Sequence, residues 1–171
     1  MIILDTNVIF ELMRRTPERA VTEWLDRQAE PSVWTTPIVV FEIRFGFQVL
    51  PPSRRRSRLE DEFERLVADD LGHRVVAFDT AAAEQAAVLM AARRRAGRPG
   101  ELRDTLIAGI VLASHATLAT RNTRHFADLP VAIVNPWDAW ARAVPCRGTA
   151  ASAVSSAGIT RSPRPPPRFR S

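Results

Sequence analysis

Short apolar runs alternate along the chain with longer stretches in which apolar residues recur at helical spacing. The five short runs predict buried strands at Ile2–Leu4, Val33–Thr35, Val75–Phe78, Thr117–Ala119 and Val131–Val134. The longer stretches predict helices over about residues 6–14, 18–29, 37–50, 55–69, 80–97 and 103–115. Short buried strands separated by helices are typical of a parallel sheet covered on both faces. We therefore expect an α/β fold with a parallel sheet of about five short strands.

The alternation stops after residue 145. Residues 146–171 consist largely of Ala, Ser, Pro and Arg and contain almost no large apolar side chain. Such a segment cannot bury enough surface to offset the entropy lost on ordering. We predict a domain over residues 1–145 and a disordered tail over residues 146–171. The tail is either a solvated extension or a weak, salt-sensitive contact for RNA phosphates.

Composition and charge narrow the class of protein. A chain of 171 residues that is 46% hydrophobic fits one globular domain. Its apolar runs are far shorter than the roughly 18 residues that a membrane span needs, and its N-terminus lacks a secretory signal, so we expect a cytoplasmic protein without membrane contact. The formal charge of +5 arises in the tail, where five arginines and no acid follow position 145. The high pI therefore says little about the partner of the domain.

Three acidic residues occupy positions that suggest chemistry. Asp5 directly follows the first predicted strand, Glu42 interrupts an apolar helix, and Asp104 begins another helix. Helix capping is the alternative role for Asp5 and Asp104, and simple solvent exposure is the alternative for Glu42. Carboxylates that converge repel one another unless a cation holds them, and oxygen ligands favour Mg²⁺ or Mn²⁺ over zinc. The acids are therefore candidate metal ligands.

Other catalytic signatures are missing from the sequence. The three histidines have no Cys or His partner at zinc-site spacing, and there is neither a phosphate-binding loop, nor a dinucleotide fingerprint, nor a nucleophile elbow. After the strand Thr117–Ala119, the side-chain oxygens of Thr120 and Asn122 are positioned to accompany the acids, although Asn122 also suits a simple turn.

Four sequence elements, in order, resemble the signature of PIN domains. They are Ile2-Ile-Leu-Asp-Thr-Asn7, the isolated Glu42, Asp104-Thr-Leu-Ile-Ala108 and Thr120-Arg-Asn-Thr123. More narrowly, they resemble the VapC toxins of type II toxin–antitoxin modules, and Asn135-Pro136-Trp137 is similar to the FitB branch of that family. The resemblance covers about residues 1–140. It implies a three-layer α/β/α PIN domain that is the ribonuclease toxin of a VapBC-like system.

The resemblance also implies roles for individual residues. Asp5, Glu42 and Asp104 would bind Mg²⁺ or Mn²⁺ and carry the hydrolysis of RNA phosphodiester bonds, leaving a 5′-phosphate and a 3′-hydroxyl. Four residues would support the acids or bound waters, namely Thr6, Asn7, Thr120 and Asn122. Arginines are the expected RNA contacts: Arg54, Arg55, Arg56 and Arg121, with Arg93, Arg94 and Arg95 as a further cluster, although such runs are often only solvated.

The sequence departs from the family pattern near its fourth element. The family frequently has an acid where this chain has Asn122, and His125 stands where many relatives have another acid. We expect a second metal to bind weakly, with activity that is low or dependent on Mn²⁺. Glu101, three residues before Asp104, is a candidate to compensate.

Partners follow from the same resemblance. We expect a VapB/FitA-like antitoxin, operator DNA bound only through that antitoxin, and a homodimer or a toxin–antitoxin hetero-oligomer. Apolar residues of the first two helices are candidate antitoxin contacts, with core packing as the alternative: Ile9, Phe10, Leu12, Met13, Val21, Trp24 and Leu25.

Other functions remain open at this point. The main alternative is a catalytically weak PIN protein that acts mainly as partner of a DNA-binding antitoxin in operator binding and autoregulation. RNA processing without an antitoxin is another. A haloacid-dehalogenase-like phosphatase is disfavoured, because Asn7 stands where that class needs a second aspartate.

Overall fold

The computed structural model describes residues 1–138. The predicted end of the domain at residue 145 and the predicted tail lie outside these residues. Within them, four parallel strands form one sheet in the order β2-β1-β3-β4. The strands are β1 Ile2–Leu4, β2 Val33–Trp34, β3 Thr117–Ala119 and β4 Ile133–Val134. The central strand β1 pairs with β2 on one side and with β3 on the other.

The predicted strand at Val75–Phe78 is wrong, so the sheet has four strands instead of five. This segment makes only an isolated parallel bridge, in which the N–H groups of Thr35 and Val76 bond to the carbonyls of Arg74 and Thr35. The reason lies in β2. Thr36 caps the next helix, which begins at Pro37, so only one extended residue follows Thr35 and the pairing cannot continue along the segment.

The six predicted helices are confirmed, most of them with shorter ends. They are α1 Thr6–Leu12, α2 Arg19–Asp26, α3 Pro37–Val49, α4 Arg54–Arg65, α5 Thr80–Arg95 and α6 Leu102–Ala113. A π-helical turn, Leu66–Asp70, extends α4, and short 3₁₀ helices span Glu30–Ser32 and Thr123–Phe126. The side chains of Thr36, Ser53 and Asp79 accept backbone N–H groups at the starts of α3, α4 and α5. Local capping therefore fixes where three of the helices begin.

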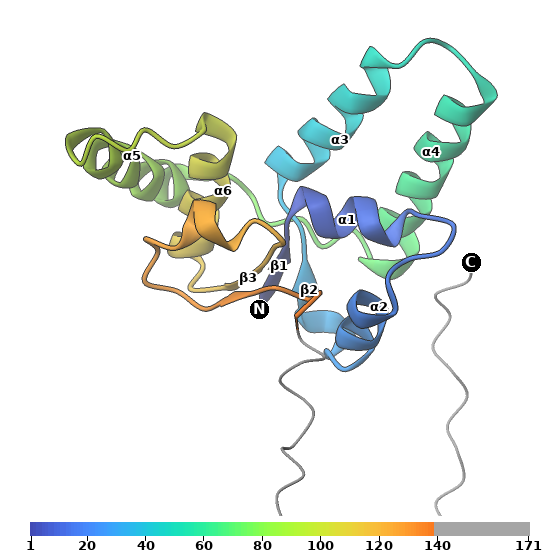
Figure 1. The fold of residues 1–171 in the computed structure, drawn as a ribbon, viewed down its shortest axis with the longest axis horizontal. Helices are drawn as coiled ribbons and strands as arrows, with labels where there is room; N and C mark the ends of the chain where they lie inside the picture. Colours follow the sequence, from blue (N-terminus) through green and yellow to red (C-terminus); the bar gives the residue numbers. More distant parts are fainter. Residues whose placement is uncertain (139–171) are drawn as a thin grey trace, which may run out of the picture.

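The helices build the outer layers around the strands, as the three-layer fold requires. In Figure 1, α5 and α6 lie together on one side of the strands, and α3 and α4 form a long hairpin on the other. The core between the layers consists of fully buried residues of β1, β3, α1 and α6, among them Ile3, Leu4, Val8, Ile107 and Leu118. None of the helices among residues 1–138 is long and apolar enough to cross a membrane.

Candidate active site

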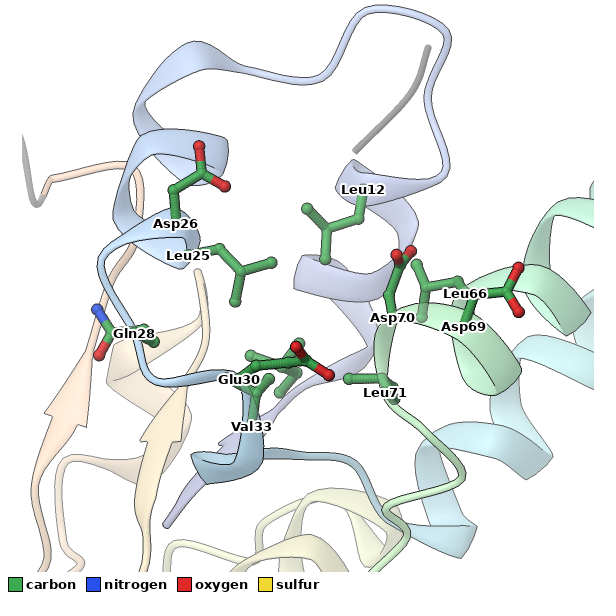
Figure 2. Close-up of a pocket in the computed structure, with 11 residues that line it drawn as sticks. Leu12, Leu25, Asp26, Gln28, Glu30, Val33, Leu66, Asp69, Asp70 and Leu71 are labelled. Atoms are coloured by element: carbon green, nitrogen blue, oxygen red, sulfur yellow. The ribbon is translucent and has the colours of Figure 1, made fainter. Parts of the chain in front are cut away.

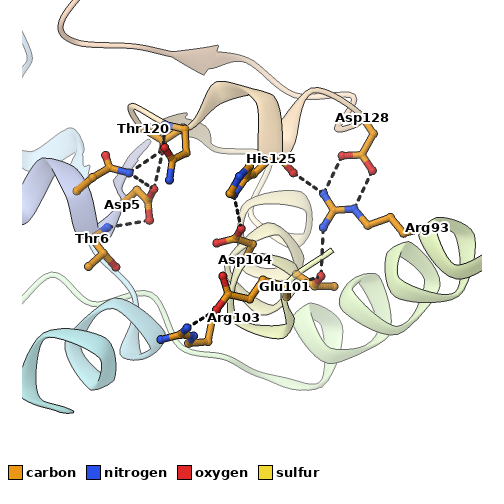
Figure 3. A network of polar contacts seen from close by, with 12 residues as sticks. Asp5, Thr6, Arg93, Glu101, Arg103, Asp104, Thr120, His125 and Asp128 are labelled. Carbon is orange, nitrogen blue, oxygen red and sulfur yellow. Dashed lines mark hydrogen bonds and ion pairs between the residues drawn. The ribbon is translucent and has the colours of Figure 1, made fainter. Parts of the chain in front are cut away.

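Asp5 lies at the carboxyl end of β1 and caps α1. Its Oδ1 accepts the backbone N–H of Thr6 at 2.8 Å, while its Oδ2 accepts the Thr120 hydroxyl at 2.6 Å and the Asn7 amide at 2.7 Å. Figure 3 shows these bonds joining the β1–α1 turn to the residue that follows β3. The Asp5 side chain is buried at 5% exposure. Capping is thus a real role of Asp5, and it leaves the carboxylate at the sheet edge where the other site residues gather.

Burial raises the pKa of Asp5. The hydrogen bonds from Thr120 and Thr6 act in the opposite direction, and the negative charges of Asp104 and Glu42 raise the pKa further. Charges act on one another over short distances in a partly buried site. The three predicted acids, which are far apart in the sequence, therefore share one electrostatic environment.

Glu42 lies on α3 and is largely buried. One carboxylate oxygen accepts the hydroxyl of Thr6, and the other lies 3.3 Å from Nη1 of Arg103. Simple solvent exposure, which was the alternative role for Glu42, is therefore wrong. The sequence missed Arg103, because the partner comes from another helix and not from the i+3 or i+4 position of α3. The only signal for Arg103 in the sequence was its position next to Asp104.

Asp104 lies in the first turn of α6, where the helix dipole favours an anion. Its Oδ2 is 2.8 Å from Nδ1 of His125, so its carboxylate faces the loop after β3 (Figure 3). The residue at the N-cap position of α6 is Glu101, whose side chain makes no capping bond. An open hollow of about 750 Å³ adjoins Asp104 and is lined in part by Glu101, Arg124 and His125.

Thr120 and Asn7 join the two loops of the site. The Thr120 hydroxyl also accepts the Asn7 amide at 3.1 Å and the backbone N–H of Asn122 at 3.0 Å. The Asn7 carbonyl oxygen accepts the backbone N–H of Arg121 at 2.9 Å. Asn122 itself is exposed at the start of the 3₁₀ helix Thr123–Phe126, and its contact to Thr120 comes from its backbone. These residues hold the sheet edge together around Asp5.

The predicted RNA-binding arginines are divided between two places. Arg121 lies in the site loop, with its guanidinium 5.1 Å from the ring centre of Trp137. Arg54, Arg55 and Arg56 begin α4, at the end of the α3–α4 hairpin away from the strands (Figure 1). Arg56 is engaged there, since it contacts Glu60 and Gln48 as well as the Leu50 carbonyl. Only Arg121 lies beside the acids.

Arg93 is buried and cannot contact RNA phosphates. It forms two hydrogen bonds to Asp128, at 2.7 and 2.8 Å, and donates to the His125 carbonyl and the Thr105 hydroxyl. These bonds connect α5 to the loop that carries His125 and to the residue after Asp104 (Figure 3). Arg93 therefore supports the site from behind, which corrects its assignment to an exposed arginine cluster.

A separate cavity of about 270 Å³ lies between α1, α2 and the π-helical turn (Figure 2). Leu12, Leu25 and Leu71 line it, with Asp69 and Asp70 at its edge. Burial, followed by the charges of Asp69 and Glu30, raises the pKa of Asp70 to about 6. Its lining residues do not include Asp5, Glu42 or Asp104, so this cavity is distinct from the candidate active site.

The acids suit a hard divalent cation in their chemistry. The negative charges of Asp104 and Glu42 help to raise the pKa of Asp5, and a bound cation would neutralise this repulsion. Oxygen donors suit Mg²⁺ or Mn²⁺. As arranged, however, residues 1–138 contain no group of three or more His, Cys, Asp or Glu side chains that could hold a metal ion. In this arrangement Glu42 contacts Arg103 and Asp104 contacts His125. The donor set fits the metal, and two of its members are engaged with other partners.

Comparison with known proteins identifies the family. The PIN domain model matches residues 2–132. The chain is 38% identical to the VapC ribonuclease Y4jK of Sinorhizobium fredii, covering 81% of this chain and 99% of that protein. It is 32% identical to the toxin FitB of Neisseria gonorrhoeae, covering 80% of this chain and 99% of FitB.

A solved structure agrees with these sequence matches. The structure of FitAB bound to a DNA fragment superposes with a TM-score of 0.72 at 32% identity, covering 80% of this chain and 96% of the matched one. The chain therefore belongs to the PIN domain family and, within it, to the VapC group that includes FitB.

Proposed function

We propose that this protein is the toxin of a VapBC-like toxin–antitoxin system and that it cleaves RNA with the help of Mg²⁺ or Mn²⁺. The observation that supports the proposal is the position of Asp5 at the sheet edge, where Thr6 joins it to Glu42 and where the charge of Asp104 acts on it. The 38% identity to a VapC ribonuclease over nearly its whole length supports the same activity. An enzyme that cleaves phosphodiesters needs such an anionic centre in order to hold a cation.

Each residue has a role that follows from its surroundings. Asp5, Glu42 and Asp104 would hold the metal, which when bound lowers the pKa of a water molecule and stabilises charge on the phosphoryl oxygens. Thr120 and Asn7 fix the Asp5 carboxylate by donating to it, and the bond from Thr120 favours its ionised form. Arg121, held against Trp137, is positioned to bind a neighbouring RNA phosphate. Asn122 adds a carbonyl oxygen without charge, so a second metal would bind weakly.

The partner we propose is an antitoxin of the VapB/FitA type, through which the complex would bind operator DNA. An apolar stripe on α3 supports a protein partner, since Phe41, Phe45 and Val49 are 57%, 54% and 68% exposed. Among the apolar residues of α1 and α2, Ile9 and Val21 are fully buried and belong to the core, whereas Phe10 is 42% exposed and free to contact a partner.

Cleavage of total RNA by the purified, antitoxin-free protein tests the activity. With Mn²⁺ or Mg²⁺, mapping of new 5′-phosphate ends should show discrete cuts. Asp5→Asn should reduce cleavage by about a hundredfold or more, because it removes a charge from the metal site. Asp61→Asn, an exposed position on α4, is the matched control and should cut like the wild type. Full cleavage by Asp5→Asn would refute the proposed catalytic centre.

The second candidate function is a catalytically weak PIN protein that acts mainly in operator binding and autoregulation. Asn122 and the contacts of Glu42 with Arg103 and of Asp104 with His125 favour it. Under this alternative, the toxin–antitoxin complex binds operator DNA equally well with wild-type protein and Asp5→Asn, while neither protein cuts RNA in either metal. Cytoplasmic localisation stays a prediction from the sequence.

A further inference from the structure

A cationic side chain of the protein itself lies against one of the proposed metal ligands. Arg103, in the first turn of α6, places Nη1 3.3 Å from Oε1 of Glu42 and also contacts Glu101. An arginine guanidinium stays charged throughout the pH range in which proteins are folded.

Both oxygens of Glu42 are engaged in this arrangement. One accepts the Thr6 hydroxyl, and the other faces Arg103. A divalent cation that takes Glu42 as a ligand must share this carboxylate with a guanidinium, and two cations on one carboxylate repel each other. Metal binding at Glu42 and the ion pair to Arg103 therefore oppose each other.

The Arg103 side chain can move away from Glu42. Its side chain is 44% exposed, and Glu101, which is 52% exposed, offers a second anion next to it. Water competes for the exposed guanidinium and weakens its ion pair with the largely buried Glu42. The contact to Glu42 is thus an exchangeable one, and Arg103 can leave it without breaking into the core.

We propose that Arg103 competes with the divalent cation for Glu42 and thereby lowers the affinity of the active site for Mg²⁺ and Mn²⁺. This inference rests on the proposed function, because it takes the three acids as the metal site. It accounts for the lack of a ready three-residue metal group among residues 1–138. Under this proposal Arg103 changes the affinity of the site for the metal but is not itself a metal ligand.

Direct Mn²⁺ binding to the full-length, RNA-free protein tests the proposal, measured by the electron paramagnetic resonance signal of free Mn²⁺. Arg103→Gln should tighten binding by about threefold to tenfold, because it removes the competing charge. Arg103→Lys keeps the charge and should stay nearer to the wild type. Arg44→Gln removes an equal charge from α3, where Arg44 pairs with Glu64 at 2.7 Å, and should leave binding unchanged.

The outcomes distinguish this inference from the proposed function. Unchanged or weaker Mn²⁺ binding in both Arg103→Gln and Arg103→Ala, with circular dichroism confirming that the variants fold, would overturn the role of Arg103. Asp5→Asn is measured alongside them and should lose most of the binding. If Asp5→Asn binds Mn²⁺ as well as the wild type, the acids are not the metal site and both proposals fail. If Asp5→Asn loses Mn²⁺ binding but the Arg103 variants bind Mn²⁺ no more tightly than the wild type, the metal site is supported and the competition by Arg103 is refuted.

Discussion

At the scale of single residues, Thr120 has the densest set of contacts in the site. Its hydroxyl is fully buried, donates to Asp5 at 2.6 Å, and accepts from the Asn7 side chain and the Asn122 backbone. A hydroxyl that both donates and accepts fixes the positions of three groups at once. Thr120 thus holds the ends of β1 and β3 together, and its hydrogen bond lowers the pKa of Asp5 against the effect of burial.

Replacing this hydroxyl should change the pH dependence of cleavage. Thr120→Val removes the donor that opposes the rise in the pKa of Asp5, so that pKa should rise further. Because the ionised carboxylate holds the cation, the acidic limb of the pH–activity profile should move to higher pH. The measurement is the initial rate of cleavage of a defined RNA in Mn²⁺ at several pH values. Thr120→Ser retains the hydroxyl and should keep the wild-type limb.

The same substitution, Thr120→Val, should also lower the free energy of unfolding. A buried carboxyl whose pKa is raised in the folded state costs stability as pH rises from the ordinary aspartate pKa of about 3.9 through the raised value. Thr120→Val should therefore lose about 1–2 kcal/mol of unfolding free energy at pH 7, and less at about pH 3, below the ordinary aspartate pKa, where Asp5 is mostly protonated in both proteins. Equal losses in urea unfolding at both pH values would show that the hydroxyl does not act through Asp5.

At the scale of elements, the pairing of α5 with α6 depends on Gly109. A Cβ built at this position would lie 2.4 Å from the Ala82 carbonyl oxygen and 2.7 Å from the Ala86 Cβ. Gly109→Ala should destabilise the fold by about 1–3 kcal/mol, because the two helices must move apart. Thermal or urea unfolding measures the loss. Gly46→Ala, on α3 with open space around it, should instead stabilise the fold by roughly 0.5–1 kcal/mol.

Sequence periodicity predicted these elements well where local signals define them. The apolar runs located β1 and β3, and all six helices lie within or close to their predicted ranges, because spacing and capping are properties of neighbouring residues. The strand at Val75–Phe78 failed, since a strand also needs a partner and β2 ends too early to provide one. Contacts between helices, such as Glu42 with Arg103 and Asp104 with His125, have no signature in the spacing of either partner.

Arg93 also shows that local sequence patterns do not reveal contacts with residues far away in the sequence. Within Arg93-Arg94-Arg95 the three residues look equivalent, and only one is buried. Helical spacing offered a signal, because Ala82, Ala86 and Arg93 lie on one face of α5, the face that packs on α6. The buried partners of Arg93, however, come from the loop after β3, which no pattern in α5 reveals.

At the scale of the whole molecule, charge is distributed unevenly along the chain. The acids proposed for the metal site lie within residues 1–138, whereas five of the arginines follow position 145, where the sequence contains no acid. Under the proposed function, RNA would therefore meet an anionic active centre and a separate cationic segment. Affinity for RNA and the rate of cleavage should depend on different parts of the chain.

Replacing the five arginines after position 145 with glutamine in the full-length protein should separate these two properties. RNA affinity should fall by about threefold to tenfold at 50 mM salt and hardly at all at 300 mM, because phosphate contacts release counterions and weaken steeply with salt. The cleavage rate at saturating RNA should stay at the wild-type value, since the acids are untouched. Filter binding and single-turnover cleavage across a salt series measure both quantities. A lower rate at saturating RNA would place the arginine-rich segment in the catalytic step, and an affinity loss that persists at 300 mM salt would indicate contacts beyond charge.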